Sequence, residues 1–210
     1  MSAPARAFTV RHVQLLRALF AAAAAVMITF SSDHSAAVGL SVFSGFTFVT
    51  GFVLILAVFL VLPAGSRWPY VILGLLGFAA GMATGIPMWR TNDLFFIVVS
   101  SWALITGAVE LLAGVRARRA GDSTGRDGVI IGAFGVLLGI LLLLIPAGFT
   151  HDYTIDEAGT FELSGIILGV GMFGGYAALV AVFLGIAGLT PKKADAVASA
   201  SVPAESGDAR

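Results

Sequence analysis

The chain has 210 residues, of which 58% are hydrophobic and only 11% are charged, and its formal net charge is zero. A soluble globular domain would carry roughly 25% charged residues, so the composition excludes an ordinary soluble protein and predicts an integral membrane protein. The sequence contains no cysteine, which excludes disulfides, thiolate catalysis and zinc or iron–sulfur centres held by cysteine.

Several apolar segments reach the roughly 20 residues that cross a bilayer core. In chain order, the segments cover residues 13–30, 37–62, 70–87, 94–115, 128–148 and 163–189. The predicted fold class is therefore all-α integral membrane with six transmembrane helices, which form a membrane domain over residues 13–189. We expect residues 1–12 to be a cytoplasmic N-terminus. Residues 190–210 are polar, rich in Ala and Ser and without periodicity, so we expect a disordered cytoplasmic tail.

Basic residues are distributed unevenly between the two sides of these segments. The side that holds both termini includes Arg6, Arg11, Arg17, Arg67, Arg116, Arg118, Arg119, Arg126, Lys192 and Lys193. The opposite side has Arg90 together with the acids Asp33, Asp93, Asp152, Asp156, Glu157 and Glu162. Because Lys and Arg accumulate in cytoplasmic loops, we expect both termini on the cytoplasmic side (N-in/C-in) of a bacterial cytoplasmic or inner membrane.

The apolar segments also contain an internal repeat. FVTGFVLILAVF in the second segment aligns with LITGAVELLAGV in the fourth, so that Thr50 and Gly51 match Thr106 and Gly107. The third segment, VILGLLGFAAGMATGIP, aligns with VIIGAFGVLLGILLLLIP in the fifth. The pattern predicts three tandem helix hairpins, residues 13–62, 70–115 and 128–189.

Glycine recurs at helical spacing inside the repeats. Spacings of three and four residues lie on one face of a helix, and small residues on such a face let two helices approach closely in lipid. We predict helix–helix seams along these faces, and a ligand groove is the alternative. The predicted packing residues are Gly74, Gly77, Gly81, Gly107, Gly132, Gly135 and Gly139.

Glu110 is a carboxylate inside the apolar segment LITGAVELLAGVRARR. A helical projection places it on the same face as Thr106 and Gly107, which predicts that it faces protein. A charge in the membrane interior needs a partner or a proton. We predict an ion pair with Arg17, which lies at a comparable depth. Solvation at the interface near Arg116, or a proton- or ion-binding role for Glu110, are the alternatives.

The predicted outer connections carry two His–Asp neighbours. Asp33 and His34 lie in the first, and His151 and Asp152 lie in the third. Imidazole is the side chain whose ordinary charge change falls between neutral and mildly acidic medium, so these four residues are candidates for a pH-responsive surface. Ordinary loop polarity and a metal site are the alternatives, although no ligand spacing supports a metal.

No motif indicates catalysis, a cofactor or nucleic-acid binding. No nucleophile has a base beside it in the sequence, and no glycine fingerprint for nucleotides follows a soluble strand. We predict no catalytic residues, no metal ligands and no cofactor. The expected partners are the lipid bilayer and a second copy of the chain or another membrane protein, because glycine faces left over after intramolecular packing would join protomers.

The glycine-spaced helices resemble those of a known family. RALFAAAAAVMITF, GLLGFAAGMATGIP, GAFGVLLGILLLLIP and WALITGAVELLAGVRARR are similar to helices of HdeD-like acid-resistance membrane proteins. The resemblance covers roughly residues 13–189 and implies a six-helix inner-membrane protein associated with acid resistance, with no catalytic or binding residues to carry over. This chain departs from the family in its longer connection before the sixth segment and in its tail.

Three functions remain open at this point. The first is a non-enzymatic membrane protein of HdeD-like type that supports acid or envelope stress tolerance or acts as an accessory subunit. The second is a small proton- or ion-coupled transporter or channel that uses Glu110. The third is a membrane-embedded enzyme that acts through the outer His and Asp residues.

Overall fold

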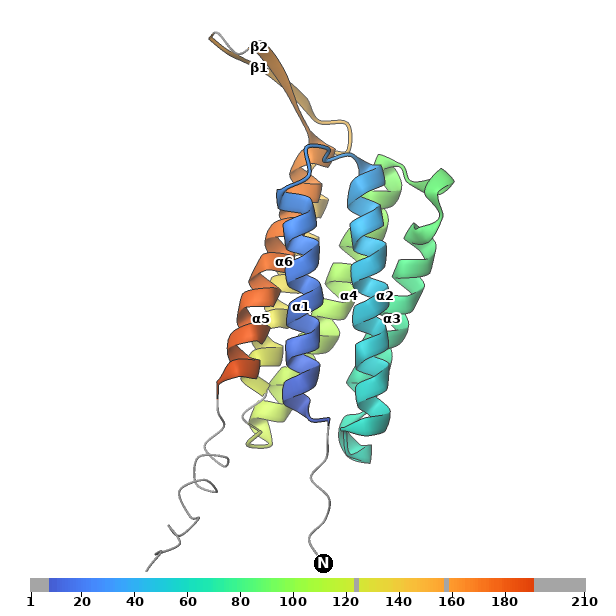
Figure 1. The fold of residues 1–210 in the computed structure, drawn as a ribbon, viewed down its shortest axis with the longest axis vertical. Coiled ribbons are helices and arrows are strands. Elements are labelled where there is room, and N and C mark those ends of the chain that lie inside the picture. Colours follow the sequence, from blue (N-terminus) through green and yellow to red (C-terminus); the bar gives the residue numbers. More distant parts are fainter. Residues whose placement is uncertain (1–7, 123–124, 157–158, 191–210) are drawn as a thin grey trace, which may run out of the picture.

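The computed structural model describes residues 8–122, 125–156 and 159–190. Within these residues, six helices are long and apolar enough to cross a membrane. They are α1 (Val10–Thr29), α2 (Ala36–Leu60), α3 (Trp68–Gly85), α4 (Asn92–Arg119), α5 (Gly125–Leu144) and α6 (Gly165–Leu189). The helices form one bundle, and α1 begins at the same end of it at which α6 finishes (Figure 1). The expected cytoplasmic tail lies outside the described residues, except for its first residue.

The expected apolar segments all form helices, with boundaries that differ by a few residues. Helix α1 begins at Val10 because Thr9 and His12 close a reciprocal cap at its start, with the Thr9 amide donating to His12 Nδ1 at 3.2 Å. Helix α4 continues past the apolar segment to Arg119, since its last turn is basic and suits the negative end of the helix dipole. Two short 3₁₀ helices, η1 (Ala64–Ser66) and η2 (Pro87–Trp89), connect α2 to α3 and α3 to α4.

The most extensive helix contacts are those of α4 with α5, α1 with α6 and α2 with α3. At each of the seven predicted packing glycines, an atom of a neighbouring helix lies within 3.1 Å of the position that a Cβ would take. Added Cβ atoms at Gly74 and Gly77 would stand 2.6 Å from Ile55 Cγ1 and 2.8 Å from the Thr47 carbonyl oxygen. The glycine faces of α3 and α5 therefore lie against α2 and α4, the helices that precede them in the chain.

Two of these interfaces have nearly the same geometry. A Cβ at Gly77 of α3 would lie 3.2 Å from Gly51 Cα of α2, and one at Gly135 of α5 would lie 3.0 Å from Gly107 Cα of α4. The two helix pairs thus bring backbone against backbone at matching glycines. Such close approach supplies dispersion contacts where lipid gives helices little hydrophobic reason to associate.

The core is aromatic in the half of the bundle opposite the chain ends. The Phe43, Phe95 and Phe173 side chains are fully buried. Phe43 makes edge-to-face contacts with Phe173 and Trp102, at ring-centroid distances of 5.5 and 5.2 Å. Edge-to-face pairs of this kind pack favourably beyond the area that they bury, so this cluster fills the bundle interior at that level.

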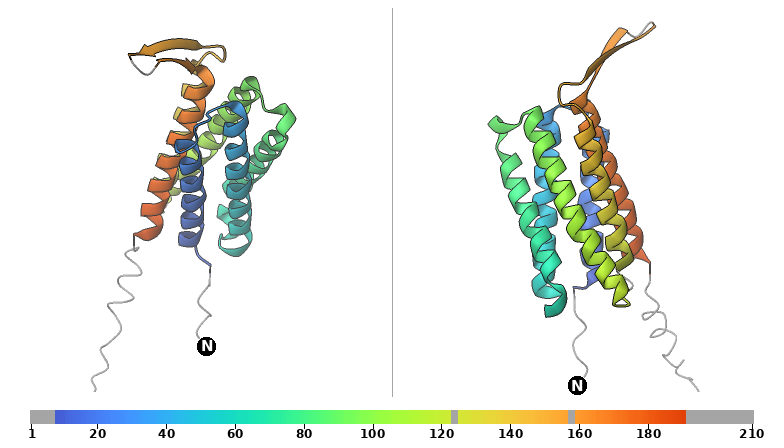
Figure 2. Two further views of the ribbon diagram at one scale, coloured as in Figure 1. Left: turned by 45° about the horizontal axis from the view of Figure 1, so that its top comes forward. Right: turned by 180° about the vertical axis from the view of Figure 1, so that it is seen from behind.

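The connection between α5 and α6 forms an antiparallel β-hairpin, where hydropathy predicts only a polar connection. Strands β1 (Thr150–Ile155) and β2 (Gly159–Ser164) pair with His151 opposite Leu163. All residues of β1 are exposed. The hairpin projects beyond the bundle at the end away from the chain termini (Figures 1 and 2). Its β-branched and aromatic residues favour strands, and Gly159 adopts the positive φ of 101° that the turn requires.

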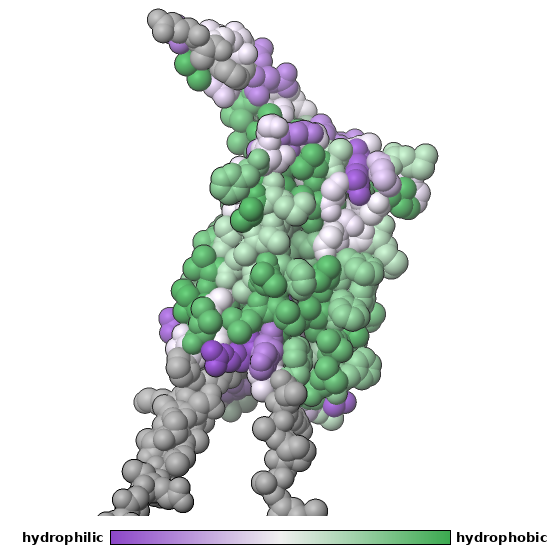
Figure 3. Space-filling view, viewed as in Figure 1, coloured by the Kyte–Doolittle hydropathy of each residue, from purple (hydrophilic) through white to green (hydrophobic). Residues whose placement is uncertain are grey.

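Hydrophobic and polar residues are separated along the length of the bundle. The middle of the visible surface is apolar, and hydrophilic residues gather at its two ends (Figure 3). Large apolar side chains of the helices, such as Leu19, Phe52 and Ile97, are each more than half exposed. A belt of this kind suits a hydrocarbon environment, as the composition predicts.

Candidate functional site

A vestibule of about 650 Å³ enters the bundle at the end where α1 begins. Its wall combines the first turns of α1, α3 and α5, the last turns of α4 and the connection between α2 and α3. The lining includes Val10, Gln14, Arg17, Trp68, Tyr70, Glu110, Ala113, Ala117, Asp122 and Asp127. A volume of this size lies within the range of pockets that hold small molecules.

Charged and polar groups on the vestibule wall are tied to neighbouring helices. Gln14 Nε2 of α1 donates to Asp127 Oδ2 of α5 at 3.1 Å. The Arg116 guanidinium lies over the Trp68 ring, 5.5 Å from its centroid. Arg116 therefore packs against the vestibule rim, and the helices around the opening are held together by these contacts.

The floor of the vestibule is an ion pair between Arg17 of α1 and Glu110 of α4. Arg17 Nη2 lies 2.9 Å from Glu110 Oε1, and each side chain is only 13% exposed. Glu110 reaches this position because its helix face carries Thr106, Gly107 and Gly114, which are all buried. The structure thus brings together the two residues that the sequence paired, and it joins the first and fourth helices.

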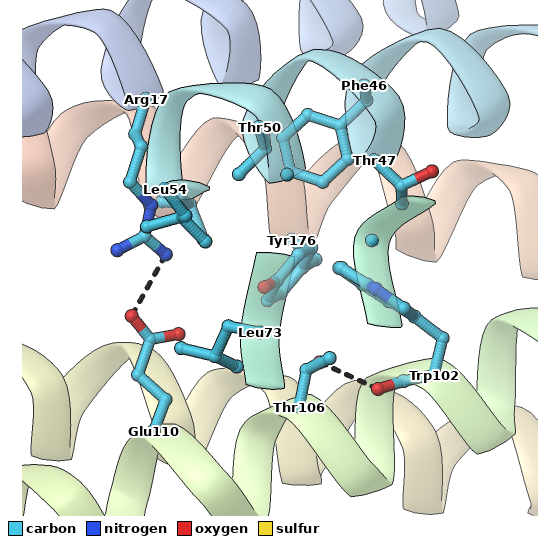
Figure 4. A pocket seen from close by; sticks show the side chains of 13 residues that line it. Arg17, Phe46, Thr47, Thr50, Leu54, Leu73, Trp102, Thr106, Glu110 and Tyr176 are labelled. Carbon is cyan, nitrogen blue, oxygen red and sulfur yellow. Dashed lines mark hydrogen bonds and ion pairs between the residues drawn. The ribbon is translucent and has the colours of Figure 1, made fainter. Parts of the chain in front are cut away.

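A second, smaller cavity of about 30 Å³ lies beyond the ion pair, deeper in the bundle. Arg17, Glu110 and Leu73 line both cavities, so the ion pair stands at the boundary between them. Thr50 of α2 and Tyr176 of α6 point into the same space (Figure 4). The volume exceeds the roughly 10–15 Å³ that a cavity needs to hold one water molecule.

Several buried polar atoms in this region have no hydrogen-bond partner within the described part of the chain. They are Thr50 Oγ1, Trp102 Nε1, Arg17 Nε and, on the vestibule side, Gln14 Oε1. By contrast, the hydroxyls of Thr47 and Thr106, which line the same small cavity, donate to carbonyl oxygens of their own helices at 2.9 and 2.6 Å. A buried polar group without a partner costs free energy, so the small cavity suits a polar occupant.

Sequence reasoning missed Gln14, Thr50, Trp102 and Tyr176. Each is an uncharged residue in an apolar helix, and neither hydropathy nor a charge distinguishes it from its neighbours. The available signal was that Thr50 and Thr106 match across the repeat and that Thr106 shares the face of Glu110. The convergence of Thr50, Trp102 and Tyr176 on the small cavity depends on how three helices pack, which one sequence does not specify.

The structure does not bring the outer candidates together. Asp33 and His34 lie in the turn between α1 and α2, where the Asp33 carboxylate accepts from the Ser35 amide at 2.8 Å and the Ser35 hydroxyl at 3.1 Å. His151 and Asp152 are exposed on β1. Among the described residues, no hydrogen bond or ion pair joins the two groups. No three His, Cys, Asp or Glu side chains in the described ranges are placed to hold a metal ion.

Six apolar helices with polar ends define a multi-pass membrane protein, here with a vestibule that narrows to a buried ion pair. Comparison with known proteins found no matching family model, curated protein or solved structure. The resemblance to HdeD-like proteins therefore stays a prediction, and function has to be argued from the site itself.

Proposed function

We propose that this protein is a small proton- or ion-coupled transporter that uses Glu110. The observation that carries the proposal is the meeting of two cavities at the Arg17–Glu110 pair, a large vestibule of about 650 Å³ and a small cavity of about 30 Å³. Ionisable side chains within a membrane are costly, and they commonly mark ion or proton pathways. A pair that served only to join two helices would need neither the vestibule nor the partnerless polar atoms behind it.

The half of the bundle opposite the chain termini is filled by side chains, which supports a carrier rather than a continuous channel. The buried aromatic cluster of Phe43, Phe95 and Phe173 fills the interior beyond the small cavity. Carriers bind their substrates near the middle of the membrane and open to one side at a time. The arrangement fits a carrier in the conformation that is open at the end where α1 begins.

We further propose that this open end faces the cytoplasm, that both termini lie there, and that the chain is three tandem helix hairpins. The arginines of α4's last turn support the orientation. The matching approach of Gly77 to Gly51 and of Gly135 to Gly107 supports the repeat.

Cysteine labelling tests the orientation, because the sequence has no cysteine of its own. Ala117→Cys places a thiol on the vestibule wall, and Thr154→Cys places one on the exposed hairpin. In inside-out vesicles, a membrane-impermeant maleimide should label the first and spare the second. The reverse pattern would show that the vestibule opens to the outside.

Ion gradients across proteoliposomes test transport. Gradients of sodium, potassium or chloride are imposed one at a time while an enclosed pH dye reports proton movement. At least one gradient should drive proton movement that Glu110→Gln abolishes. Glu162→Gln on the exposed hairpin serves as the matched control and should leave the movement intact. If no gradient moves protons in a Glu110-dependent way, the transporter proposal is wrong.

A second candidate is the stress-tolerance or accessory role that the HdeD-like resemblance implies. The observation in its favour is the β-hairpin, which projects from the bundle and presents an exposed strand that could contact another protein (Figure 2). Survival of a deletion strain after acid challenge tests this role, with complementation by the wild type and by His34/His151 double substitution. Equal survival with and without the gene would rule out acid tolerance.

A further inference from the structure

The small cavity is lined by hydrogen-bond donors that have no partner. Guanidinium and indole nitrogens donate and cannot accept, so Arg17 Nε and Trp102 Nε1 each offer an unused hydrogen. The third group is the hydroxyl of Thr50, a residue that is 8% exposed. Donors beside a fixed positive charge suit an anion, and they disfavour a metal cation.

The ion pair explains how an anion could enter a site that already holds a carboxylate. Arg17 keeps its positive charge at all physiological pH values, and in the membrane interior it needs one negative charge beside it. Glu110 supplies that charge at 2.9 Å. When Glu110 takes up a proton its charge is lost, and a small anion at Arg17 Nε restores neutrality. One proton and one anion then enter together, and the net charge of the site is unchanged.

We propose that the small cavity binds one small monovalent anion of chloride size beside Arg17, with the Thr50 hydroxyl and the Trp102 indole as the further donors that line the cavity, together with one proton on Glu110. The cavity volume of about 30 Å³ exceeds the roughly 10–15 Å³ that one water molecule needs and lies far below the roughly 300 Å³ of pockets that hold small organic molecules, so it suits a halide-sized ion better than a large organic anion. This inference rests on the proposed transport function and names its ion: the coupled movement would be of a proton with a halide-sized anion.

Glu110 is the group that gives this binding its pH dependence. The other titratable or charged groups around it are Arg17 from α1, Tyr70 from α3, Tyr176 from α6, Asp127 from α5, Asp122 from the α4–α5 connection and Arg116 on its own helix. Phenol and guanidinium groups keep their protons through the neutral range. Asp127 bonds to Gln14 on the vestibule wall, and Glu110 alone among the carboxylates lines the small cavity. Helix α2 adds no titratable group to that lining.

Tryptophan fluorescence of the full-length protein in detergent tests the site. The sequence has three tryptophans, so a Trp68→Phe/Trp89→Phe background leaves Trp102 as the only reporter. Sodium chloride should change its fluorescence saturably, and sodium gluconate should not. Chloride affinity should fall by about tenfold for each pH unit over the range in which Glu110 is ionised in the free protein, because one proton binds with each anion.

Direct proton counting gives an independent readout. Adding chloride to weakly buffered protein should cause uptake of about one proton per chain, since the linkage is reciprocal. Glu110→Gln should still bind chloride, now without pH dependence or proton uptake, and chloride should raise its unfolding temperature more than that of the wild type at neutral pH. Wild-type binding that is flat with pH, or proton uptake that persists in Glu110→Gln, would overturn the inference.

Two threonines of α2 provide a matched test of the donor argument. Thr50→Val removes a hydroxyl that has no partner, and Thr47→Val removes one that bonds to the Phe43 carbonyl oxygen. Both residues line the small cavity. Thr50→Val should weaken chloride binding by about tenfold or more, as expected for a lost hydrogen bond to a charged group, and Thr47→Val should change it little. Equal effects in two folded variants would contradict the donor argument.

The transporter proposal and the anion-site proposal can each be refuted without refuting the other. If chloride has no effect in any of these measurements but a sodium or potassium gradient drives Glu110-dependent proton movement, the small cavity holds water only, and the anion inference is wrong while transport stands. If chloride binds with a proton and no gradient moves protons through proteoliposomes, the anion site is supported and the transporter proposal is wrong.

Discussion

Gly107 lies on the seam where α4 and α5 meet backbone to backbone, so Gly107→Ala should separate two helices that now touch. An added Cβ would stand 2.6 Å from the Val136 amide nitrogen and 2.9 Å from the Gly132 carbonyl oxygen. Both atoms belong to the backbone of α5, which cannot rotate away as a flexible side chain can. The clash must therefore be relieved by moving one helix.

The size of the effect follows from two opposing terms. Overpacking a well-packed interface by one methyl group costs about 1–3 kcal/mol, and replacing glycine by alanine in a helix interior gains up to about 1 kcal/mol. Gly175 of α6 offers a matched control, because nothing lies within 4 Å of a Cβ added there. Gly175→Ala has the gain in helix propensity without the overpacking cost. The two variants should therefore differ by that cost, about 1–3 kcal/mol in unfolding free energy.

Unfolding by sodium dodecyl sulfate in mixed micelles, followed by circular dichroism, measures this difference. Gly107→Ala should unfold at a lower detergent fraction than the wild type, and Gly175→Ala should unfold at the same fraction or a higher one. Equal midpoints for the two variants would mean that α4 and α5 do not pack through Gly107, and the glycine-seam argument would be wrong.

Two further outcomes can be checked by the same unfolding assay. Arg17→Glu and Glu110→Arg should each lower the unfolding free energy by about 3–5 kcal/mol, because each leaves two like charges in a site that is 13% exposed. The double reversal should recover most of this loss. If it recovers none, the two side chains do not form the pair. Replacing residues 151–163 by a short Gly–Ser linker should leave the detergent fraction at the unfolding midpoint unchanged, because the residues of β1 are exposed and contribute little to the core. A large loss of stability would show that the hairpin supports the bundle.

Hydropathy and helical spacing were sufficient to predict the helices and the partner of Glu110. The apolar segments are long, and a helix is the simplest way to satisfy backbone hydrogen bonds in lipid. Glu110 shares a face with Gly107, which had to lie against protein. Arg17 was the arginine at a similar depth within another helix. Local periodicity therefore carried enough information to relate two residues far apart in the chain.

The vestibule and the small cavity could not be predicted in the same way. Thr50, Trp102 and Tyr176 come from three helices, and whether their polar atoms share one space depends on the crossing of all three. The hairpin was missed for another reason. Its strand signal lies in a polar segment between two apolar ones, where hydropathy shows only a connection, although the alternation in THDYTI is typical of a strand.

The glycine seams and the vestibule have a common physical origin. Close backbone approach concentrates packing within the pairs α2–α3 and α4–α5, while α1 packs against α6. Contacts between successive pairs, such as α3 with α4 or α5 with α6, are much less extensive. At the end of the bundle near the chain termini, the interior between the pairs stays open as far as Arg17 and Glu110. The aromatic cluster around Phe43 fills the bundle interior at the other end. The bundle therefore opens on one side only, and this opening leads to the buried charges of Arg17 and Glu110.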